Sequence, residues 1–411
     1  MRKLLLSLCV AAPALCATSI AYGQSSATDS STSPAMDASY FQACVLNLRS
    51  DAVSRGIPAN VADRALDNVE VDQRVLDLDR RQPEFLLTFW KYIGNSITED
   101  RVSKGRQLLA QQRALFQKIS QRYGVQPEYL VAFWGLESNY GQFMGDFATI
   151  RSLVTLACDD RRPKFFADQL VEALRMMAGD HIDQAMMKGS WAGAFGQTQF
   201  MPSTFTSFAV DGDGDGRRDM FRSLPDIFSS SANYLSKSGW KTGQRAAIEV
   251  VLPQNFPWDQ AEPAIEKTIA EWQVLGVRRV DGQSLGAPDT MAAIGLPAGN
   301  RGPAFLLLPN FKVIMVWNRS LLYGLAVELL AQRLAGKNAT TAVQTIDEPP
   351  LSATDIVELQ DTLRRLGHYE GELDGLVGPK TRNGIRAYQR QAGLPADGFP
   401  DQDLMSRIRR R

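Results

Sequence analysis

Glu137 has the sequence surroundings of a general acid. Phe133 and Trp134 lie four and three residues before it in an apolar run. On a helix, side chains at this spacing share one face. Aromatic neighbours solvate a carboxylate poorly, which favours its protonated form and suits Glu137 to donate a proton near neutral pH. The alternative is an acidic residue hydrogen-bonded by its own loop, because Asn139 and Gly141 can end the helix just after it.

A second segment, residues 189–204, has the composition of a ligand-binding wall. It reads Gly-Ser-Trp-Ala-Gly-Ala-Phe-Gly-Gln-Thr-Gln-Phe-Met-Pro-Ser-Thr. Its small residues let backbone approach a ligand closely. Ser190 and Gln199 offer short-reach hydrogen bonds, and Trp191 and Phe200 offer faces on which a sugar ring can stack. The alternative is a glycine-rich turn between packed helices.

Together, Glu137-Ser138-Asn139-Tyr140-Gly141 and the 189–204 segment strongly resemble the lytic murein transglycosylases, specifically the transglycosylase B family. The resemblance extends from about residue 41 to residue 336. It implies a lysozyme-like helical domain with Glu137 as its catalytic acid. It also implies a saccharide cleft lined by Ser138, Ser190, Gln199, Phe200, Tyr234, Trp317 and Asn318.

The chain departs from that family in its closing motif. The family usually carries Tyr-Asn-x-Ser, whereas this chain carries Trp317-Asn318-Arg319-Ser320. The aromatic wall is kept, but the family's tyrosine hydroxyl has no counterpart at Trp317.

The residues from Asp211 to Arg217 resemble the first half of an EF-hand calcium loop. Asp211, Asp213 and Asp215 take positions one, three and five, a glycine takes position six, and the backbone carbonyl of Arg217 takes position seven. Position twelve, normally glutamate, is arginine here. In the resembled family an aspartate at the start of the next helix completes the site, which indicates Asp226, with Asp219 as the alternative.

Three aspartates packed this closely repel each other unless a cation lies among them. The sequence therefore predicts a structural Ca²⁺, with Na⁺ able to use the same oxygens, and no organic cofactor. The alternative is a plain Asp-Gly turn.

The first 23 residues have the pattern of a secretory signal peptide. Arg2 and Lys3 precede an apolar run that ends near a small-x-small site at Ala21-Tyr22-Gly23. The run is shorter than a membrane span needs, so no span is expected in the mature chain. A lipoprotein is disfavoured because leucine precedes both Cys9 and Cys16. A periplasmic protein follows, with residues 24–39 as a disordered linker.

Composition excludes several classes of partner. The chain of 411 residues has 45 basic and 45 acidic residues, and removing the signal peptide leaves a net charge of −2 because it takes Arg2 and Lys3. This balance gives no reason to expect nucleic acid. The chain has only two histidines, which argues against a histidine-rich zinc hydrolase.

The mature chain keeps two cysteines, Cys44 and Cys158. An even pair in an exported protein predicts a disulfide rather than two buried thiols.

The pattern predicts a mainly α (α+β) catalytic domain over residues 40–336. Helical periodicity covers residues 40–123, and further helices are expected around Glu137, over 163–177, over 227–237 and from 320 to 335. Residues 247–252, 305–308 and 313–317 are predicted to be short strands of a small antiparallel sheet.

A linker over residues 337–350 precedes a compact unit over residues 351–411. Three helical stretches separated by Asp374-Gly375 and Asp397-Gly398 turns resemble the peptidoglycan-binding domain type 1. The alternative is a generic helical interaction module.

The resemblance implies a lytic transglycosylase that cuts peptidoglycan glycan strands between N-acetylmuramic acid and N-acetylglucosamine and leaves a 1,6-anhydromuramyl end. One acid suffices because no water must be activated, whereas ordinary glycosidases need two. The first rival is a hydrolysing muramidase with Asp159 or Asp160 as second carboxylate. Glu84 is better explained by the dipole of the helix it begins. The second rival is a wall-binding protein without catalysis.

Overall fold

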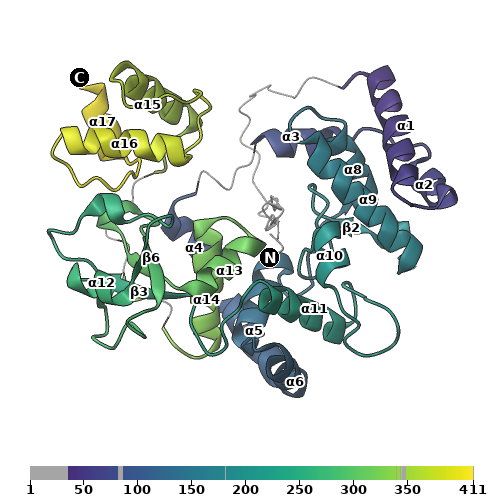
Figure 1. Ribbon diagram of the computed structural model, residues 1–411, viewed down its shortest axis with the longest axis horizontal. Helices are drawn as coiled ribbons and strands as arrows, with labels where there is room; N and C mark the ends of the chain where they lie inside the picture. Colours follow the sequence, from purple (N-terminus) through teal and green to yellow (C-terminus); the bar gives the residue numbers. More distant parts are fainter. Residues whose placement is uncertain are drawn as a thin grey trace, which may run out of the picture. The chain divides into compact units, whose positions relative to one another are not determined.

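The computed structural model describes residues 36–81, 87–180, 182–338, 340–342, 344 and 349–410. The chain divides into two compact units, the first of residues 1–82 and 103–242 and the second of residues 83–102 and 243–411 (Figure 1). The predicted signal peptide lies outside the described residues, as does most of the predicted linker. The linker predicted over residues 24–39 ends earlier than expected, because Ala38 and Ser39 already belong to the first helix. The residue that caps this helix, Asp37, accepts a hydrogen bond from the Tyr40 N–H at 2.9 Å.

The first unit is helical, as predicted, with one two-stranded ladder. Its elements are α1 (Ala38–Ser54), α2 (Ala59–Leu66), α3 (Gln73–Arg81), α6 (Arg113–Tyr123), α7 (Pro127–Ser138), β1 (Phe147–Ala148), α8 (Thr149–Ala157), α9 (Pro163–Gly179), β2 (Lys188–Gly189), α10 (Pro202–Phe208) and α11 (Leu224–Lys237). Helix α5 (Glu99–Gln111) begins in the second unit and ends in the first.

Helix α7 carries Glu137 and is buried along most of its length. Pro127 occupies its first turn, where the missing N–H costs no hydrogen bond, and Glu128 complements the helix dipole there. Every residue from Tyr129 to Ser138 is buried. A helix that is buried on all sides cannot shift without disturbing several neighbours, so α7 gives its last turn a firm position.

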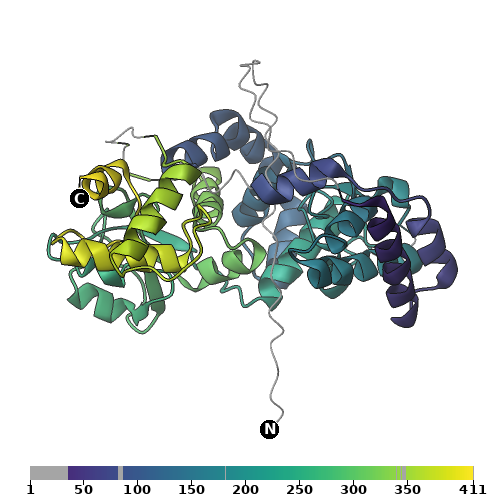
Figure 2. The same cartoon turned by 90° about the horizontal axis from the view of Figure 1, so that it is seen from above.

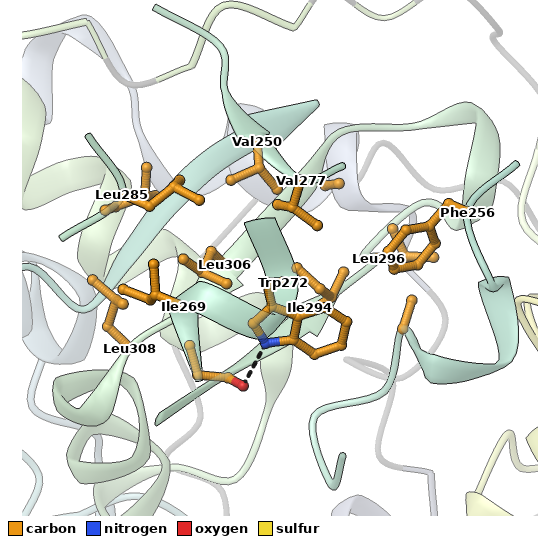
Figure 3. Packing of buried hydrophobic residues seen from close by; sticks show 14 residues of the cluster. Val250, Phe256, Ile269, Trp272, Val277, Leu285, Ile294, Leu296, Leu306 and Leu308 are labelled. Atoms are coloured by element: carbon orange, nitrogen blue, oxygen red, sulfur yellow. Dashed lines mark hydrogen bonds between the residues drawn. The ribbon is translucent and has the colours of Figure 1, made fainter. Parts of the chain in front are cut away.

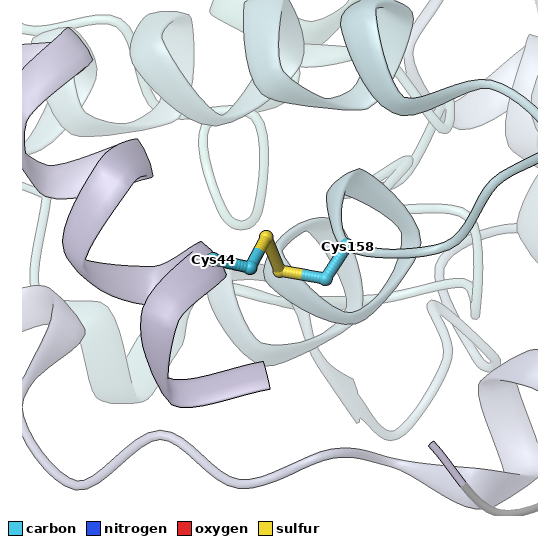
Figure 4. The surroundings of a disulfide bond; sticks show 2 residues. All are labelled: Cys44 and Cys158. Carbon is cyan, nitrogen blue, oxygen red and sulfur yellow. A yellow bond between two sulfur atoms is a disulfide. The ribbon is translucent and has the colours of Figure 1, made fainter. Parts of the chain in front are cut away.

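A disulfide joins two helices at the edge of this unit (Figure 4). Cys44 lies on α1 and Cys158 follows the last turn of α8, and their sulfur atoms are 2.04 Å apart. Next to Cys158, the buried Asp79 carboxylate of α3 pairs with both Arg161 and Arg162. The covalent and ionic links hold α1, α3 and the end of α8 together.

The second unit contains a five-stranded antiparallel sheet in the order β4-β6-β7-β3-β5. The strands are β3 (Ala247–Val251), β4 (Glu266–Thr268), β5 (Arg278–Arg279), β6 (Met291–Gly295) and β7 (Ala304–Leu307). Helix α12 (Ile269–Val274) covers the sheet with Trp272, which is fully buried in an apolar cluster (Figure 3) and donates its indole N–H to the Ala292 carbonyl at 2.8 Å. Helix α4 (Phe89–Ser96) also belongs to this unit.

The strand predicted over residues 313–317 is wrong, because these residues form the end of helix α13 (Pro309–Trp317). Pro309 starts the helix at its first turn, and Val313, Ile314 and Trp317 follow a helical spacing that places them on its buried side. A short apolar run does not by itself distinguish a strand from a buried helix. The next helix, α14 (Leu321–Leu334), is capped by Ser320 as predicted, with the Tyr323 N–H donating to the Ser320 hydroxyl at 3.3 Å.

The C-terminal module is the three-helix unit that was predicted, and its helices are the yellow group in Figures 1 and 2. They are α15 (Ala353–Arg365), α16 (Pro379–Gln391) and α17 (Gln402–Arg409), packed around one apolar cluster. Its two Asp-Gly turns are built alike. In each, a buried glutamine, Gln360 or Gln389, donates to the turn aspartate and accepts from the turn glycine N–H.

The module packs on the sheet part of the second unit rather than standing apart from it. Arg386 of α16 pairs with Glu262 at 2.7 Å, and Asp397 accepts the Asn300 backbone N–H at 2.7 Å. The linker is also held, since Glu249 of β3 accepts the backbone N–H groups of Thr341 and Ala342.

Within the described part of the chain, no single helix is long and apolar enough to cross a membrane. The bent pair of α13 and α14, which meet at 116°, passes that test on length and composition alone.

Candidate active site

Glu137 lies in the last turn of α7, where the helix is stopped abruptly. Its side chain is 3% exposed. The three residues that follow Ser138 all have left-handed backbone conformations: φ is 49° at Asn139, 64° at Tyr140 and 78° at Gly141. Such conformations are costly for non-glycine residues and persist only where the surroundings impose them. The turn therefore fixes the direction in which the chain leaves Glu137.

Ser138 holds this turn from inside. Its hydroxyl donates to the Gln197 carbonyl at 2.6 Å and accepts the Gly141 N–H at 2.9 Å. The side chain is 2% exposed. These contacts give Ser138 a structural task, and its expected contact with substrate stays a prediction.

The 189–204 segment packs against this turn. The Gln199 side chain, on a residue with φ of 49°, donates to the Met144 carbonyl at 3.0 Å and to the Gly196 carbonyl at 2.8 Å. The Ser190 hydroxyl accepts the Ala194 N–H at 3.1 Å and so closes a tight turn within the segment.

Glycine is required at Gly145, where the chain after the turn meets the 189–204 segment, and at Gly189 within that segment. A Cβ on Gly145 would lie 2.0 Å from the Gly189 carbonyl oxygen, and a Cβ on Gly189 would lie 1.9 Å from that of Ala194. The small residues of the segment therefore let backbone approach backbone. The structure thus joins the turn after Glu137 and Ser138 to the segment that carries Ser190 and Gln199.

Phe200 and Trp191 are not open stacking faces, contrary to the expectation from sequence. They are 1% and 3% exposed. Phe200 meets the edge of Tyr234 at 5.8 Å between ring centroids, and Tyr234 stacks on Phe208 at 4.5 Å. These aromatic rings pack against one another. Of Phe200 and Tyr234, only Tyr234 of α11 is half-buried and reaches the surface.

Trp317 and Asn318 belong to the second unit. Trp317 ends α13 and is 6% exposed, and the Asn318 side-chain oxygen accepts the Ser320 N–H at 3.0 Å. Their expected contacts with substrate stay predictions.

The acidic loop has three carboxylates in the arrangement a cation needs. Ligand atoms of Asp211, Asp213 and Asp226 all lie within 4.8 Å of one another. Of the two candidates to complete the site, the structure thus groups Asp226 with the others. Asp219 instead turns its carboxylate to the Phe221 and Arg222 N–H groups.

Two expectations about this loop need adjusting. Asp215 lies outside the group of three, and its carboxylate accepts the Arg217 N–H at 2.8 Å. Asp226 does not begin its helix; α11 starts at Leu224 after the cap Ser223, and Asp226 lies in the first turn.

The charges of the loop suit a cation. Burial raises the pKa of the Asp226 carboxyl above its ordinary value, although N–H groups of Asp219 and Gly212 act in the opposite direction. Backbone N–H groups, foremost that of Gly216, lower the pKa of Asp211. A cation beside a buried carboxylate favours the charged form that burial disfavours, so these residues fit the predicted ion.

The second carboxylate proposed for a muramidase is occupied elsewhere. Asp159 is 6% exposed, pairs with Arg80 at 3.2 Å and accepts the Arg161 N–H at 3.3 Å. Asp160 is exposed next to it. Glu84 lies outside the described residues.

Sequence reasoning missed two residues that organise the site. Ser223 donates its hydroxyl to Asp213 at 2.7 Å and accepts the Asp226 N–H at 3.3 Å, and a serine just before a helix signals such a cap. Gln197 uses its side chain to join α7 to the end of the acidic loop. No local pattern marks it, because its partners are distant in sequence.

Comparison with known proteins agrees with this geometry. A family model for the transglycosylase SLT domain matches residues 40–332, and one for a peptidoglycan binding domain matches residues 352–408. The membrane-bound lytic murein transglycosylase B of Escherichia coli K12 is 32% identical over 251 residues, which cover 60% of this chain and 67% of that protein.

Solved structures extend the likeness over most of the chain. SltB3 from Pseudomonas aeruginosa, in complex with NAG-anhNAM-pentapeptide, superposes with a TM-score of 0.85 at 43% identity and covers 90% of this chain and 99% of that one. Escherichia coli Slt35 in complex with calcium has a TM-score of 0.64 at 29% identity, over 71% of this chain and 92% of that one. The chain therefore belongs to the family of lytic transglycosylases with an SLT domain, and it carries a C-terminal peptidoglycan-binding domain.

Proposed function

We propose that Glu137 performs both proton transfers of a lytic transglycosylase acting on peptidoglycan. As a carboxylic acid it protonates the glycosidic oxygen between N-acetylmuramic acid and N-acetylglucosamine, and the bond to C1 breaks. As the resulting carboxylate it removes the proton from the muramyl C6 hydroxyl, whose oxygen attacks C1 and closes the 1,6-anhydro ring. The proton count balances without water.

The observation that carries this assignment is the burial of Glu137 at the abrupt end of α7. A buried carboxyl group favours its neutral, proton-donating form, and the left-handed turn after it fixes its position. The positive charge that develops on the sugar must be stabilised by dipoles of the cleft and by the N-acetyl group of the substrate. Ser190, Gln199 and Tyr234 are the residues of the first unit that we assign to the cleft wall.

Glu137→Gln tests the assignment. The amide has the same shape but cannot donate the proton, so turnover should fall by about 100- to 10,000-fold while thermal stability and glycan binding are kept. Mass spectrometry of products from purified sacculi is the measurement. Glu128→Gln, on the first turn of the same helix, is the matched control and should keep normal turnover. Near-normal activity of pure Glu137→Gln would overturn the assignment.

We also propose that the acidic loop binds Ca²⁺ through Asp211, Asp213 and Asp226, with the Arg217 carbonyl as a further ligand. Asp215 remains a ligand candidate by its EF-hand position, through a shift of its side chain or through water. The ion stabilises the fold, and Na⁺ is the alternative occupant.

Chelation tests the loop. A cation that binds only the folded protein stabilises it by about 3 kcal/mol when its free concentration is one hundred times Kd. Chelator should therefore lower the melting temperature, and Asp211→Ala should abolish that response. Asp63→Ala, an exposed acid of α2, should keep it. Equal melting of the wild type in chelator and in excess calcium would exclude the site.

The remaining assignments follow from the substrate. Peptidoglycan lies outside the cytoplasmic membrane, so we assign the mature protein to the periplasm, with residues 1–23 as its signal peptide. The C-terminal module is assigned to wall binding, where holding the enzyme on an insoluble polymer makes later encounters effectively intramolecular.

A further inference from the structure

Gln197 lies between α7 and the acidic loop and uses all of its polar groups to join them. On the α7 side, its side-chain oxygen accepts the Trp134 indole N–H at 2.7 Å and its carbonyl accepts the Ser138 hydroxyl at 2.6 Å. On the loop side, its side-chain amide donates to the Phe221 carbonyl at 2.7 Å and its backbone N–H donates to the Met220 carbonyl at 2.9 Å.

Packing leaves this glutamine little freedom. A Cβ on Gly141 would lie 2.4 Å from the Gln197 side-chain oxygen, so the turn after Glu137 is shaped around it. On the other side, a Cβ on Gly196 would lie 2.7 Å from the Met220 carbonyl oxygen, and Phe195 stacks on Phe221 at 5.7 Å.

Further hydrogen bonds lead from Phe221 into the acidic loop. Asp219 donates its N–H to the Asp226 carboxylate at 2.8 Å and accepts the Phe221 N–H at 2.7 Å. Phe221 in turn gives its carbonyl to Gln197. A continuous path thus runs from Asp226 through Asp219, Phe221 and Gln197 to Trp134, one helical turn before Glu137.

We propose that Gln197 is a positioning residue that fixes the last turn of α7 and couples the position of Glu137 to cation binding in the acidic loop. The coupling rests on the proposed roles of Glu137 and of the loop. It gives the loop a part in catalysis although none of its carboxylates belongs to the cleft wall.

The first test separates positioning from substrate binding. Gln197→Met keeps the length of the side chain and removes both of its hydrogen bonds. We expect kcat to fall roughly 10- to 100-fold with KM nearly unchanged, because a small displacement of the acid impairs proton transfer more than binding. Gln169→Met is the matched control: Gln169 is a buried glutamine of α9 that accepts the Ser203 N–H of α10 at 3.0 Å. It should lose stability but keep kcat.

A reciprocal variant tests the path itself. Trp134→Phe removes the indole donor from the other end of the same hydrogen bond. If the two residues act through that bond, the double variant should lose no more kcat than the worse single variant. Multiplying effects would show that they act independently and would overturn the path.

The second test reads the coupling without measuring activity. In the full-length protein, calcium should slow amide hydrogen exchange in the peptide 131–143, and this response should disappear in Gln197→Met while the calcium-dependent rise in melting temperature remains. If calcium stabilises the protein but leaves this peptide unchanged, the coupling is wrong and the cation site stands. If calcium changes neither, both the coupling and the cation site fail. A kcat of Gln197→Met equal to the wild-type value would overturn the positioning role.

Discussion

Neutral side chains join the turn after Glu137 to the neighbouring segments. Ser138, Gln197 and Gln199 each make hydrogen bonds to backbone carbonyls of neighbouring segments. Neutral hydrogen bonds position a group without adding a formal charge, so these three side chains do not themselves shift the protonation of the acid through charge. Asp159, the second carboxylate considered for a muramidase, is instead paired with Arg80.

Asp159→Asn distinguishes a lytic from a hydrolytic enzyme. The amide cannot act as a general base but keeps the size of the side chain. We expect anhydromuramyl products to continue at a similar rate, and stability to fall by about 1–3 kcal/mol because the pairing with Arg80 is weakened. Product mass and urea unfolding are the measurements. Loss of turnover with the fold intact would instead favour the muramidase.

Among the elements, α16 shows how tertiary packing overrides helix propensity. Gly384 lies inside this helix, where alanine is intrinsically better by about 1 kcal/mol. A Cβ at this position, however, would lie 2.8 Å from the His368 carbonyl oxygen. The helix and the His368 backbone can approach this closely because the residue has no side chain.

Gly384→Ala should therefore destabilise the protein, by about 1–3 kcal/mol, through a clash that forces the helix away. Gly94→Ala is the matched control, since Gly94 lies inside α4 and its added Cβ would meet nothing within 4 Å. It should be neutral or stabilising. Thermal unfolding of both variants checks the prediction; stabilisation by Gly384→Ala would show that propensity prevails.

The disulfide acts on elements far apart in sequence, because it links α1 to the end of α8 across 114 residues. Replacing both cysteines, in Cys44→Ser/Cys158→Ser, should lower the free energy of unfolding by about 4 kcal/mol through the greater freedom of the unfolded chain. Urea unfolding gives the value, and reductant should reproduce it in the wild type. A wild type indifferent to reductant would mean that the bond contributes little.

For the molecule as a whole, the C-terminal module is a packed part of the second unit. Arg386 is buried against Glu262, and Arg301 pairs with Asp401 at 2.7 Å. Burial, together with the neighbouring Arg386, lowers the pKa of Arg382 in this module. Removing residues 351–411 would therefore remove a packed neighbour as well as a wall-binding module.

Glu262→Gln tests whether the module and the sheet unfold together. Loss of the ion pair should cost about 2 kcal/mol and separate the melting of the module from that of the sheet in calorimetry. Asp403→Asn breaks an exposed pair with Arg407 inside α17 and should change stability by less than about 0.5 kcal/mol. Two separate transitions already present in the wild type would contradict a cooperative unit.

The sequence alone determined the features that depend on local signals. Proline at the start of α7 and Asn139 at its end predict the helix that carries Glu137, and the Asp-x-Asp-x-Asp-Gly spacing predicts an acidic loop. The two Asp-Gly turns predict a three-helix module. Each signal lies within a dozen residues of the structure that it specifies.

The tertiary structure decided what depends on partners far along the chain. It made residues 313–317 the end of a helix, grouped Asp226 rather than Asp219 with the other acids, and buried the face of Phe200. It also gave Gln197 its role, through a hydrogen bond to Trp134, 63 residues away. Hydrogen-bond partners and buried faces are set by which segments meet in space, and a residue type with its sequence neighbours carries little information about that meeting.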